Sequence, residues 1–514
     1  MTYRNRNCVI TSLISIGLFF SITSIISYLF SPILIKHMVK KGLVLSSESS
    51  PVYPGWSKAP VPIYMKIYVF NITNAHEVAT NKSEVKLQEL GPYVFIEERE
   101  KINITWDHSQ GTISYHQKKN YYFSPELTNG SLDDVVYHVN VPLASLVARS
   151  INTGDTMLPN LVNSVTEENE DNALFLKHKV GEILFEGYVD SFLDWTVAEG
   201  LSPVNVTRFG FFYGRNGSIS DGLYTIYTGE ANNEDKFGEM FSWENKTEFH
   251  FWNDSVTTTS QCNQINESWP GELRPVFPAL EPVTMRLFMP ELCRWMTLSY
   301  LERTETLGLE TLRYWAAPSL FDYNIPENKC YCLGNVCPAN GVYNTSACTH
   351  GSPVFISFPH YLYADPIHAN NIKGLKPDPS KHIFYMDMEP KLGVPIDTHA
   401  RIQVNVFVYK SDNMYVVSDL ISNLMIPAIW SETTAMVSSD NADQLKLLHK
   451  KVPRAIAISS FVQITLAVLL LIAAIACTIQ SNVPAEKLMK PNRTSTPNRP
   501  ARKEYKAVVT TSFT

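Results

Sequence analysis

Six of the eight cysteines lie within 87 residues in the second half of the 514-residue chain, and their thiols are the most reactive groups that the sequence brings together. They are Cys262, Cys293, Cys330, Cys332, Cys337 and Cys348. In an oxidising compartment, six clustered cysteines predict three disulfides, whose pairing the spacing leaves open. A zinc site is the alternative, but the spacing of Cys330, Cys332 and Cys337 fits no common zinc pattern.

Ten Asn-x-Ser/Thr sequons, none with proline as x, predict N-linked glycans on the same part of the chain. They begin at Asn71, Asn81, Asn103, Asn129, Asn205, Asn216, Asn245, Asn253, Asn266 and Asn344. This is more than the composition predicts by chance, so the sequons and the cysteines together indicate an exported domain. A further sequon at Asn492 lies close to the C-terminus, where we expect it to be unused.

Catalytic motifs are missing from the sequence. It has no Gly-x-Ser-x-Gly elbow, no His-Glu-x-x-His pair and no phosphate-binding glycine loop, and its 13 histidines are scattered. The acidic neighbours Asp133-Asp134 and Glu167-Glu168 point apart on a strand or helix, so they are poor catalytic pairs. We therefore expect no enzymatic activity, no metal and no cofactor. An enzyme with an unrecognised site is the rival interpretation.

Two long uncharged runs at the ends of the chain would anchor it in a membrane, with the clustered cysteines and the sequons in the segment between the two runs. No charged residue occurs from Cys8 to Ile35 or from Ala455 to Ser481, and about 20 apolar residues suffice to cross a bilayer as a helix. We predict transmembrane helices over 8–35 and 455–481. A cleaved signal peptide is the alternative for the first run, but its apolar part is longer than usual and no small-x-small cleavage site follows.

The charges that flank the two spans predict their orientation. The N-terminal stub, residues 1–7, carries Arg4 and Arg6, and the tail, residues 482–514, carries seven basic and two acidic residues. Short basic tails are typically cytoplasmic, which makes residues 36–454 lumenal or extracellular. Basic residues beside the spans on the opposite side weaken this argument, and the sequons support it independently.

The two tails contain two further reactive features. Cys8 and Cys477 lie at the predicted cytoplasmic ends of the spans, where they are candidates for S-acylation, with unmodified helix residues as the alternative. Tyr505 and Val508 form a Tyr-x-x-apolar pattern of the kind that endocytic adaptors bind, although such short matches also arise by chance.

Composition and periodicity predict a β-rich domain between the spans. Charged residues make up 18% of the chain against about 25% in soluble domains, and the net charge of −7 excludes a strongly basic nucleic-acid-binding protein. Period-two alternation predicts strands over 61–69 and 401–409. Shorter strands are predicted near 92–97, 112–122, 208–213, 223–228, 247–252, 283–288, 295–301, 311–316 and 353–358.

Helical patterns are confined to a few places. Pro142 begins a run that ends at Asn152-Thr153-Gly154, a second run covers 158–165 and a third candidate covers 170–178. Three short helices inserted in a β-rich domain suggest a small bundle on one side of a barrel. An amphipathic stretch from Ala442 to Val452 leads into the second span.

The chain resembles the class B scavenger receptor family, whose members include the fatty-acid translocase, the high-density-lipoprotein receptor and the lysosomal integral membrane protein type 2. The similarity runs from the first span to the second. It is carried by Ile63–Asn74, Glu89–Phe95, Gly181–Tyr188, Asp221–Gly229, Cys262–Asn266, Ser357–Pro366, Met386–Gly393 and Arg401–Asn405.

The resemblance implies a non-enzymatic two-span receptor. Its ectodomain would be an antiparallel β-barrel with a three-helix bundle at the apex, here within 142–180, and a lipid tunnel through the barrel. The family's disulfide pattern implies the pairs Cys262–Cys330, Cys293–Cys348 and Cys332–Cys337.

The resemblance also implies the ligands. They would be fatty acids, sterols, phospholipids or lipoproteins, with lipid passed through the tunnel to the membrane and bound lipid in place of a cofactor. The alternative is an endosomal or lysosomal sorting receptor that binds a lysosomal protein through its apex. The protein would lie in the plasma membrane, in endosomes and lysosomes, or in both.

The implied apex is acidic here, whereas family members that capture polyanions have basic residues at the apex. Residues 142–188 carry three basic and seven acidic residues, which favours a neutral lipid or a basic protein partner. The candidate ligand or partner residues are Glu167, Glu168, Glu170, Asp171, Lys177, His178 and Lys179. His178 could sense endosomal pH, with a plain surface histidine as the alternative.

Overall fold

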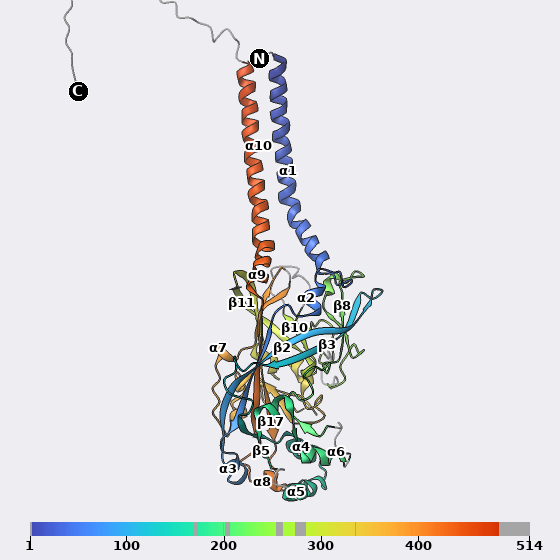
Figure 1. Cartoon of the computed structure of the whole chain (residues 1–514), viewed down its shortest axis with the longest axis vertical. Coiled ribbons are helices and arrows are strands. Elements are labelled where there is room, and N and C mark those ends of the chain that lie inside the picture. The colour runs from blue at the N-terminus through green and yellow to red at the C-terminus, as the bar shows by residue number, and fades with distance from the viewer. Residues whose placement is uncertain are drawn as a thin grey trace, which may run out of the picture. The chain divides into compact units, whose positions relative to one another are not determined.

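A computed structural model of the chain describes residues 3–168, 173–198, 200, 206–252, 261–272, 284–334, 336–391 and 393–482. These residues belong to two compact units (Figure 1). One unit contains the two terminal helices, from Met1–Leu34 and Lys451–Thr514, and the other is a central domain, Ile35–Lys450. Each unit is described by itself below.

The terminal unit is an antiparallel pair of apolar helices, α1 (Tyr3–Leu43) and α10 (Val452–Asn482). The segments Asn7–Ile35 and Val452–Gln480 are each 29 residues long, enough to cross a bilayer. The hydroxyl of Ser24 donates to the backbone oxygen of Ser460 at 2.8 Å, and Gly17 lets Ala467 approach where a side chain would be crowded.

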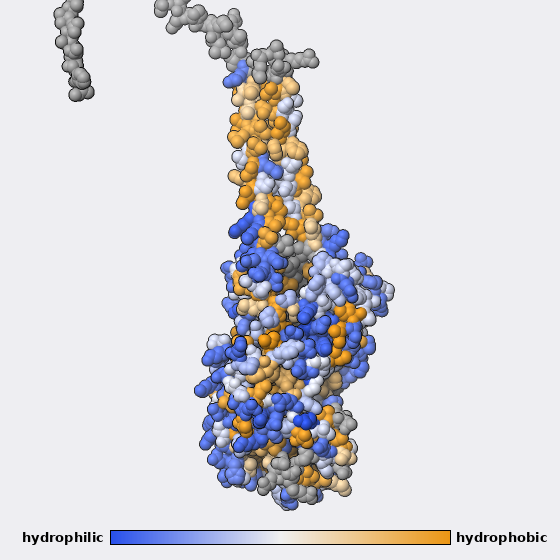
Figure 2. All heavy atoms as spheres, in the orientation of Figure 1, coloured by the Kyte–Doolittle hydropathy of each residue, from blue (hydrophilic) through white to orange (hydrophobic). Residues whose placement is uncertain are grey.

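Apolar side chains cover the outward surface of both helices (Figure 2), among them Phe19, Phe30 and Phe461, each at least 60% exposed. Exposed apolar stripes of this length are stable in lipid and not in water. The protein is therefore a two-span membrane protein, as the sequence predicts.

The central domain is built on one curled antiparallel sheet, as expected. Its main path runs through β10 (Met285–Met289), β11 (Arg294–Thr306), β12 (Leu309–Trp315), β16 (Tyr385–Glu389), β17 (Val394–Val408), β18 (Leu424–Met436), β1 (Ile63–Ile72), β2 (Val85–Asp107), β3 (Thr112–Phe123), β8 (Leu223–Tyr227) and β9 (Met240–Trp243). The two ends of the path are linked through residues 268 and 269, because the Met240 amide donates to Ser268 and the Trp269 amide donates to Arg286 of β10. The sheet is therefore a nearly closed barrel.

Strand register defines the inner face of this barrel. Neighbouring strands place Phe95 opposite Met65, and Met386 opposite both Thr398 and Tyr314, so these side chains share one face of the sheet. The same face of β2 carries Lys101, which reaches Glu272. Gly271 beside Glu272 lines a pocket with Met386, so strands far apart in the sheet point into one interior space.

Shorter elements surround the barrel. The additional strands are β13 (Val342–Asn344), β14 (Val354–Ser357), β15 (Ile372–Lys373), β4 (Val135–Val139) with β5 (Phe175–Lys179), and β6 (Tyr188–Val189) with β7 (Arg208–Phe209). The short helices are α2 (Tyr53–Ser57), α3 (Ala75–Thr80), α7 (Pro379–His382), α8 (Tyr415–Ser418) and α9 (Ser439–Lys446). In Figure 1, α2 and α9 lie at one end of the central domain and α3, α5 and α8 lie at the other.

Three helices do pack together, but they are not the three that the sequence predicts. α4 (Val141–Thr153) and α5 (Leu158–Glu168) match the first two candidates, and α4 ends at Gly154 in the left-handed conformation. The third helix is α6 (Ser191–Ala198), which lies beyond the expected range of 142–180. The candidate at 170–178 is wrong where the structure describes it, because residues 175–179 pair with β4 as strand β5.

Two predicted strands are also wrong in extent or type. Only Arg208–Phe209 of the segment 208–213 is a strand, because Phe211 and Phe212 then donate their amides to Ile183 and Leu184 in a turn. The segment 247–252 forms loops around Asn263, with only a single bridge from Glu248 to Gln264. Loop packing buries Phe249 and Trp252, whereas Tyr213 and Phe251 are exposed.

Candidate functional site

An apolar pocket opens into the barrel interior between β10, β11 and β16. Its free volume is about 20 Å³, and its lining includes Met285, Leu298, Met386 and Met388. This volume has room for about one water molecule, so a larger apolar ligand enters only where the lining side chains move apart. Methionines fill irregular apolar space and adapt to varied shapes, so this wall suits a flexible alkyl chain.

Opposed charges cross the interior beside the apolar groups. We call this set the interior ionic belt; it consists of Glu97, Arg99, Lys101, Lys119, Arg215, Asp221, Glu272 and Glu291. Lys119 Nζ lies 2.6 Å from Asp221 and 3.2 Å from Glu291. Burial alone would raise the pKa of Glu291, but the charges of Lys119 and Arg215 outweigh it and lower the pKa to about 2.

The belt was not predicted from the sequence. Glu97, Arg99 and Lys101 do alternate along β2, but Glu98 and Glu100 occupy the other face. Because both faces carry charge there, alternation cannot reveal which side is buried. The signal that could have found the belt is the pairing of this strand with β3, which places Arg99 opposite Lys119 and requires knowledge of the register.

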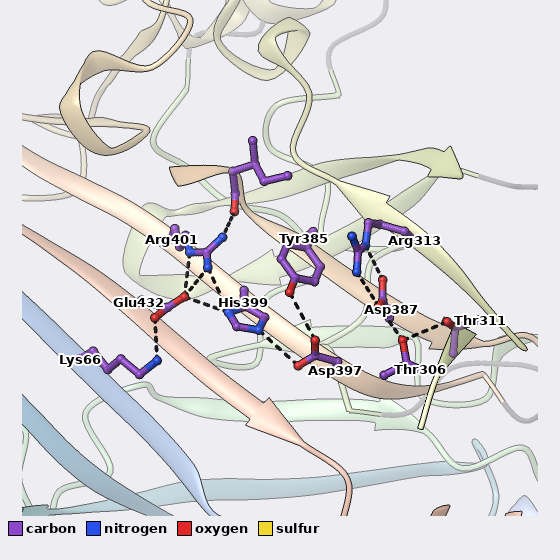
Figure 3. A network of polar contacts seen from close by, with 11 residues as sticks. Lys66, Thr306, Thr311, Arg313, Tyr385, Asp387, Asp397, His399, Arg401 and Glu432 are labelled. Atoms are coloured by element: carbon purple, nitrogen blue, oxygen red, sulfur yellow. Dashed lines mark hydrogen bonds and ion pairs between the residues drawn. The ribbon is translucent and has the colours of Figure 1, made fainter. Parts of the chain in front are cut away.

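A second polar network lies on the outer face of the sheet (Figure 3). Glu432 on β18 is at its centre, and its carboxylate lies 2.8 Å from Lys66 Nζ, from His399 Nδ1 and from Arg401 Nε. Burial alone would raise the pKa of Glu432, but hydrogen bonds from His399 and Lys66 and the charge of Arg401 lower it to about 2.

The outer network continues onto the neighbouring strands. Arg313 on β12 forms two hydrogen bonds to Asp387 on β16, at 2.7 and 2.8 Å, and Thr306 donates to the same carboxylate. Paired guanidinium–carboxylate bonds of this kind fix geometry as well as charge. These cross-strand contacts join six adjacent strands of the barrel, from β11 to β1, and are structural.

His399 makes the outer network dependent on pH. Burial lowers the pKa of His399, but hydrogen bonds to Asp397 and Glu432 outweigh this and raise it above its ordinary value of 6.5. Since the pKa is higher in the folded state, the stabilisation is fully present below pH ~6.5 and is lost as the pH rises through the folded value.

We therefore expect His399→Gln to lower the melting temperature of the full chain more at about pH 5.5 than at about pH 8.5. Thermal melts of both proteins in the same detergent at the two pH values measure this difference. An equal loss at both values would show that His399 acts through packing alone.

The cysteine cluster forms three disulfides. They join Cys262 to Cys330, Cys293 to Cys348 and Cys332 to Cys337, the same pairs that the family resemblance implies. No thiolate of the six is left for zinc, so the structure disagrees with the zinc alternative. Cys8 and Cys477, in the terminal helices, are free.

The sequon asparagines differ in exposure. Those in open positions are Asn81, Asn103, Asn129, Asn216, Asn245 and Asn266. Asn71 and Asn344 are half-buried, and the Asn71 side-chain oxygen accepts from the Tyr137 amide. Asn205 and Asn253 lie outside the described residues. Glycosylation at all ten stays a prediction.

The predicted apical residues are not one cluster in the structure. Glu167 and Glu168 end helix α5, whereas Lys177, His178 and Lys179 lie on strand β5. Glu170 and Asp171, like Tyr505, Val508 and Asn492 near the C-terminus, lie outside the described residues. The acidic and basic groups therefore belong to separate elements.

On β5 the side chains already have contacts. Lys177 lies over the ring of Tyr137, and Lys179 pairs with Asp133 at 2.8 Å. His178 Nδ1 lies 3.0 Å from Nε2 of buried His138, whose pKa falls to about 3 through burial and the charge of His178. Neutral His138 can accept a hydrogen bond from the Nδ1–H group of His178 whether His178 is neutral or protonated. The contact between the two rings therefore survives protonation of His178.

Comparisons with known proteins agree with this architecture. The model of the CD36 family matches residues 15–478. Protein peste of Drosophila melanogaster is 31% identical over 87% of the chain and 79% of its own length. Scavenger receptor class B member 1 of Mus musculus is 29% identical over 91% of the chain and 89% of its own length. Lysosome membrane protein 2 of Mus musculus is 31% identical over 83% of the chain and 85% of its own length. With two apolar terminal helices, a nearly closed antiparallel barrel and three disulfides, the chain belongs to the CD36 family, the class B scavenger receptors.

Proposed function

We propose that the protein is a non-enzymatic receptor that binds lipids or lipoproteins and passes lipid through the barrel interior to the membrane. Similarity to scavenger receptor class B member 1 within the CD36 family carries this proposal, and the apolar, methionine-rich lining inside the barrel supports it. Each methylene that enters such a pocket gains ~0.8 kcal/mol relative to water, so an alkyl chain of ordinary length offsets the cost of leaving a particle or membrane. The ligands would be fatty acids, sterols, phospholipids or lipoproteins.

Lipid retained by the purified protein tests this function. Full-length protein purified in mild detergent is expected to release long-chain lipid that mass spectrometry detects above a detergent blank. Met388→Trp fills the pocket and is expected to reduce the retained lipid several-fold, because the added ring occupies the space of the alkyl chain.

The matched control is Ile367→Trp, since Ile367 is 58% exposed on the outside of the barrel. Met388 is buried, so Met388→Trp should melt at a lower temperature than Ile367→Trp, and lipid is compared at a temperature well below both melts. Equal lipid in all three proteins, or none above the blank, contradicts the proposal.

A sorting receptor that binds a lysosomal protein is the second candidate. One observation favours it, the similarity to lysosome membrane protein 2. Binding would then involve the apical residues Glu167, Glu168, Lys177 and Lys179. Pull-down of lysosomal proteins at neutral and acidic pH, with Glu167→Lys and Lys179→Glu variants, separates the two functions.

For either function we propose that both termini are cytoplasmic. Residues 36–454 would then face the lumen or the exterior, and Tyr505 and Val508 would meet endocytic adaptors. Steady-state imaging of the tagged chain distinguishes the plasma membrane from endosomes and lysosomes.

A further inference from the structure

A short segment of the chain lies on the outer face of the barrel, from Gly374 to His382, and we call it the outer strap. It follows strand β15 and ends with helix α7. Most of its residues are exposed, but His382 is only 4% exposed, and its ring stacks on the ring of His360 at 4.5 Å. The His382 ring also lies 5.5 Å from the ring of Trp430, which shares the outer face of β18 with Glu432. One imidazole ring therefore anchors the strap to the barrel.

Proline limits the backbone contacts that the strap can make. Two of the four residues 376–379 are proline, so this stretch has only two backbone N–H groups. The Lys376 amide donates to Nδ1 of His360 at 3.1 Å, and the Asp378 amide donates to Nδ1 of His382 at 3.0 Å. Both N–H groups of this stretch therefore depend on an imidazole nitrogen that carries no proton.

His360 is held firmly beneath the strap. Its φ of 56° is uncommon for a residue other than glycine, and its amide donates to the side-chain oxygen of buried Gln403 at 2.7 Å. Its Nε2 lies 2.6 Å from the carboxylate of Glu89, which also accepts from the indole of Trp430 at 2.8 Å. Nε2 therefore carries the proton of the neutral ring. A second proton can bind only at Nδ1, where it displaces the amide of Lys376.

The groups that face the two rings differ in charge. Glu89 on β2 and Asp378 in the strap favour a protonated His382. Arg401 on β17 and a charged His360 oppose it. Strands β1 and β18 present uncharged aromatic rings to the pair, namely Phe70 and Trp430. Because like charges in stacking contact repel each other, the docked strap favours neutral rings.

Burial makes docking of the strap sensitive to acid. It has the largest effect on His382, and together with the charge of His360 it lowers the pKa of His382 to about 4. When the strap leaves the barrel, the exposed ring regains an ordinary pKa of about 6.5. Since the pKa is lower in the docked state, docking is fully stable above pH ~6.5 and weakens as the pH falls toward 4.

We propose that the outer strap is a latch, docked at neutral pH and released in acid, when a proton occupies an Nδ1 position that otherwise accepts a strap amide. Release uncovers Trp430 and His360 on the outer face of the barrel. The sheet beneath gains stability from His399 in acid, so the change is confined to the strap. The latch lies outside the barrel and does not depend on the proposed lipid-binding function.

Hydrogen exchange of the full chain in detergent, at about pH 7.5 and about pH 5.0, tests the proposal. Mass spectrometry of peptides that cover 374–382 follows the amides of Lys376 and Asp378, with the rates corrected for the intrinsic effect of pH. Their protection should fall about 30-fold at the lower pH, as expected when a pKa of about 4 becomes about 6.5 on release. Peptides from β17 should be equally protected at both values.

Three variants locate the effect. His382→Phe keeps a buried ring that cannot be protonated, so the Lys376 amide should lose far less protection in acid than it does in the wild-type protein. His108→Phe is the matched control and should behave like wild type, because the His108 side chain is 64% exposed and lies beside Glu230. His360→Gln removes the Nδ1 acceptor and should leave the Lys376 amide unprotected at both pH values.

The wild-type comparison decides the proposal whether or not the variants fold. Equal protection of the strap at the two pH values overturns the inference. Loss of protection in β17 as well as in the strap also overturns it, because the whole sheet would then be opening. An acid-induced loss in His382→Phe as large as that of the wild-type protein would exclude His382 as the group that releases the strap.

Discussion

Replacing Glu432 with alanine is expected to lower the free energy of unfolding of the central domain by about 3–5 kcal/mol. The carboxylate neutralises Lys66, His399 and Arg401, and Arg401 is only 9% exposed. Removal therefore leaves a buried guanidinium without its acid, which costs more than the pair itself contributes. Glu432→Gln keeps hydrogen bonding without the charge and should cause a smaller loss.

Thermal and guanidinium unfolding of the full chain in detergent measure this loss. Glu310→Ala is the control, because the Arg303–Glu310 pair has the same chemistry and both side chains are at least half exposed. Exposed pairs contribute at most about 1 kcal/mol, so the control should be nearly neutral. Equal losses in Glu310→Ala and Glu432→Ala would contradict the role assigned to the outer network.

Removal of the long-range disulfides is expected to have a comparable effect. Cys293–Cys348 spans 55 residues, and closure of a loop of that length restricts the unfolded chain by about 4 kcal/mol. Cys332–Cys337 spans five residues and should contribute about 2 kcal/mol. Cys293→Ser/Cys348→Ser should therefore unfold at a clearly lower denaturant concentration than Cys332→Ser/Cys337→Ser.

Serine replacement of both partners avoids an unpaired thiol, so loop length is the main difference between these variants. Unfolding of each double variant in guanidinium, beside wild-type protein under non-reducing conditions, gives the two losses. A larger loss for the short loop would mean that native packing around Cys332 matters more than chain entropy.

The sequence predicts best where one face of an element is apolar and the other polar. Strands β1 and β17 alternate clearly, and both are present close to the predicted ranges. The predicted stop at Gly154 is the end of α4, because glycine readily adopts the left-handed conformation that ends the helix. The spans follow from length and hydropathy alone, since lipid imposes both.

Prediction fails where burial and polarity do not coincide. Strand β2 extends from Val85 to Asp107, but only 92–97 is predicted, because its second half carries charges on both faces. Residues 175–179 are predicted as part of a helix, yet they form strand β5 because they pair with β4. The ion pair of Lys101 and Glu272 links positions 171 residues apart, which no local pattern can reveal.

The antiparallel pairing of α1 and α10 has a consequence for the two free thiols. Ser24 meets Ser460 and Gly17 meets Ala467, so the same register continued toward the chain ends brings Cys8 level with Cys477. Acyl chains added to both would therefore enter one leaflet side by side, at equal depth. Together they would form a double anchor, and two chains hold a protein at a membrane far longer than one.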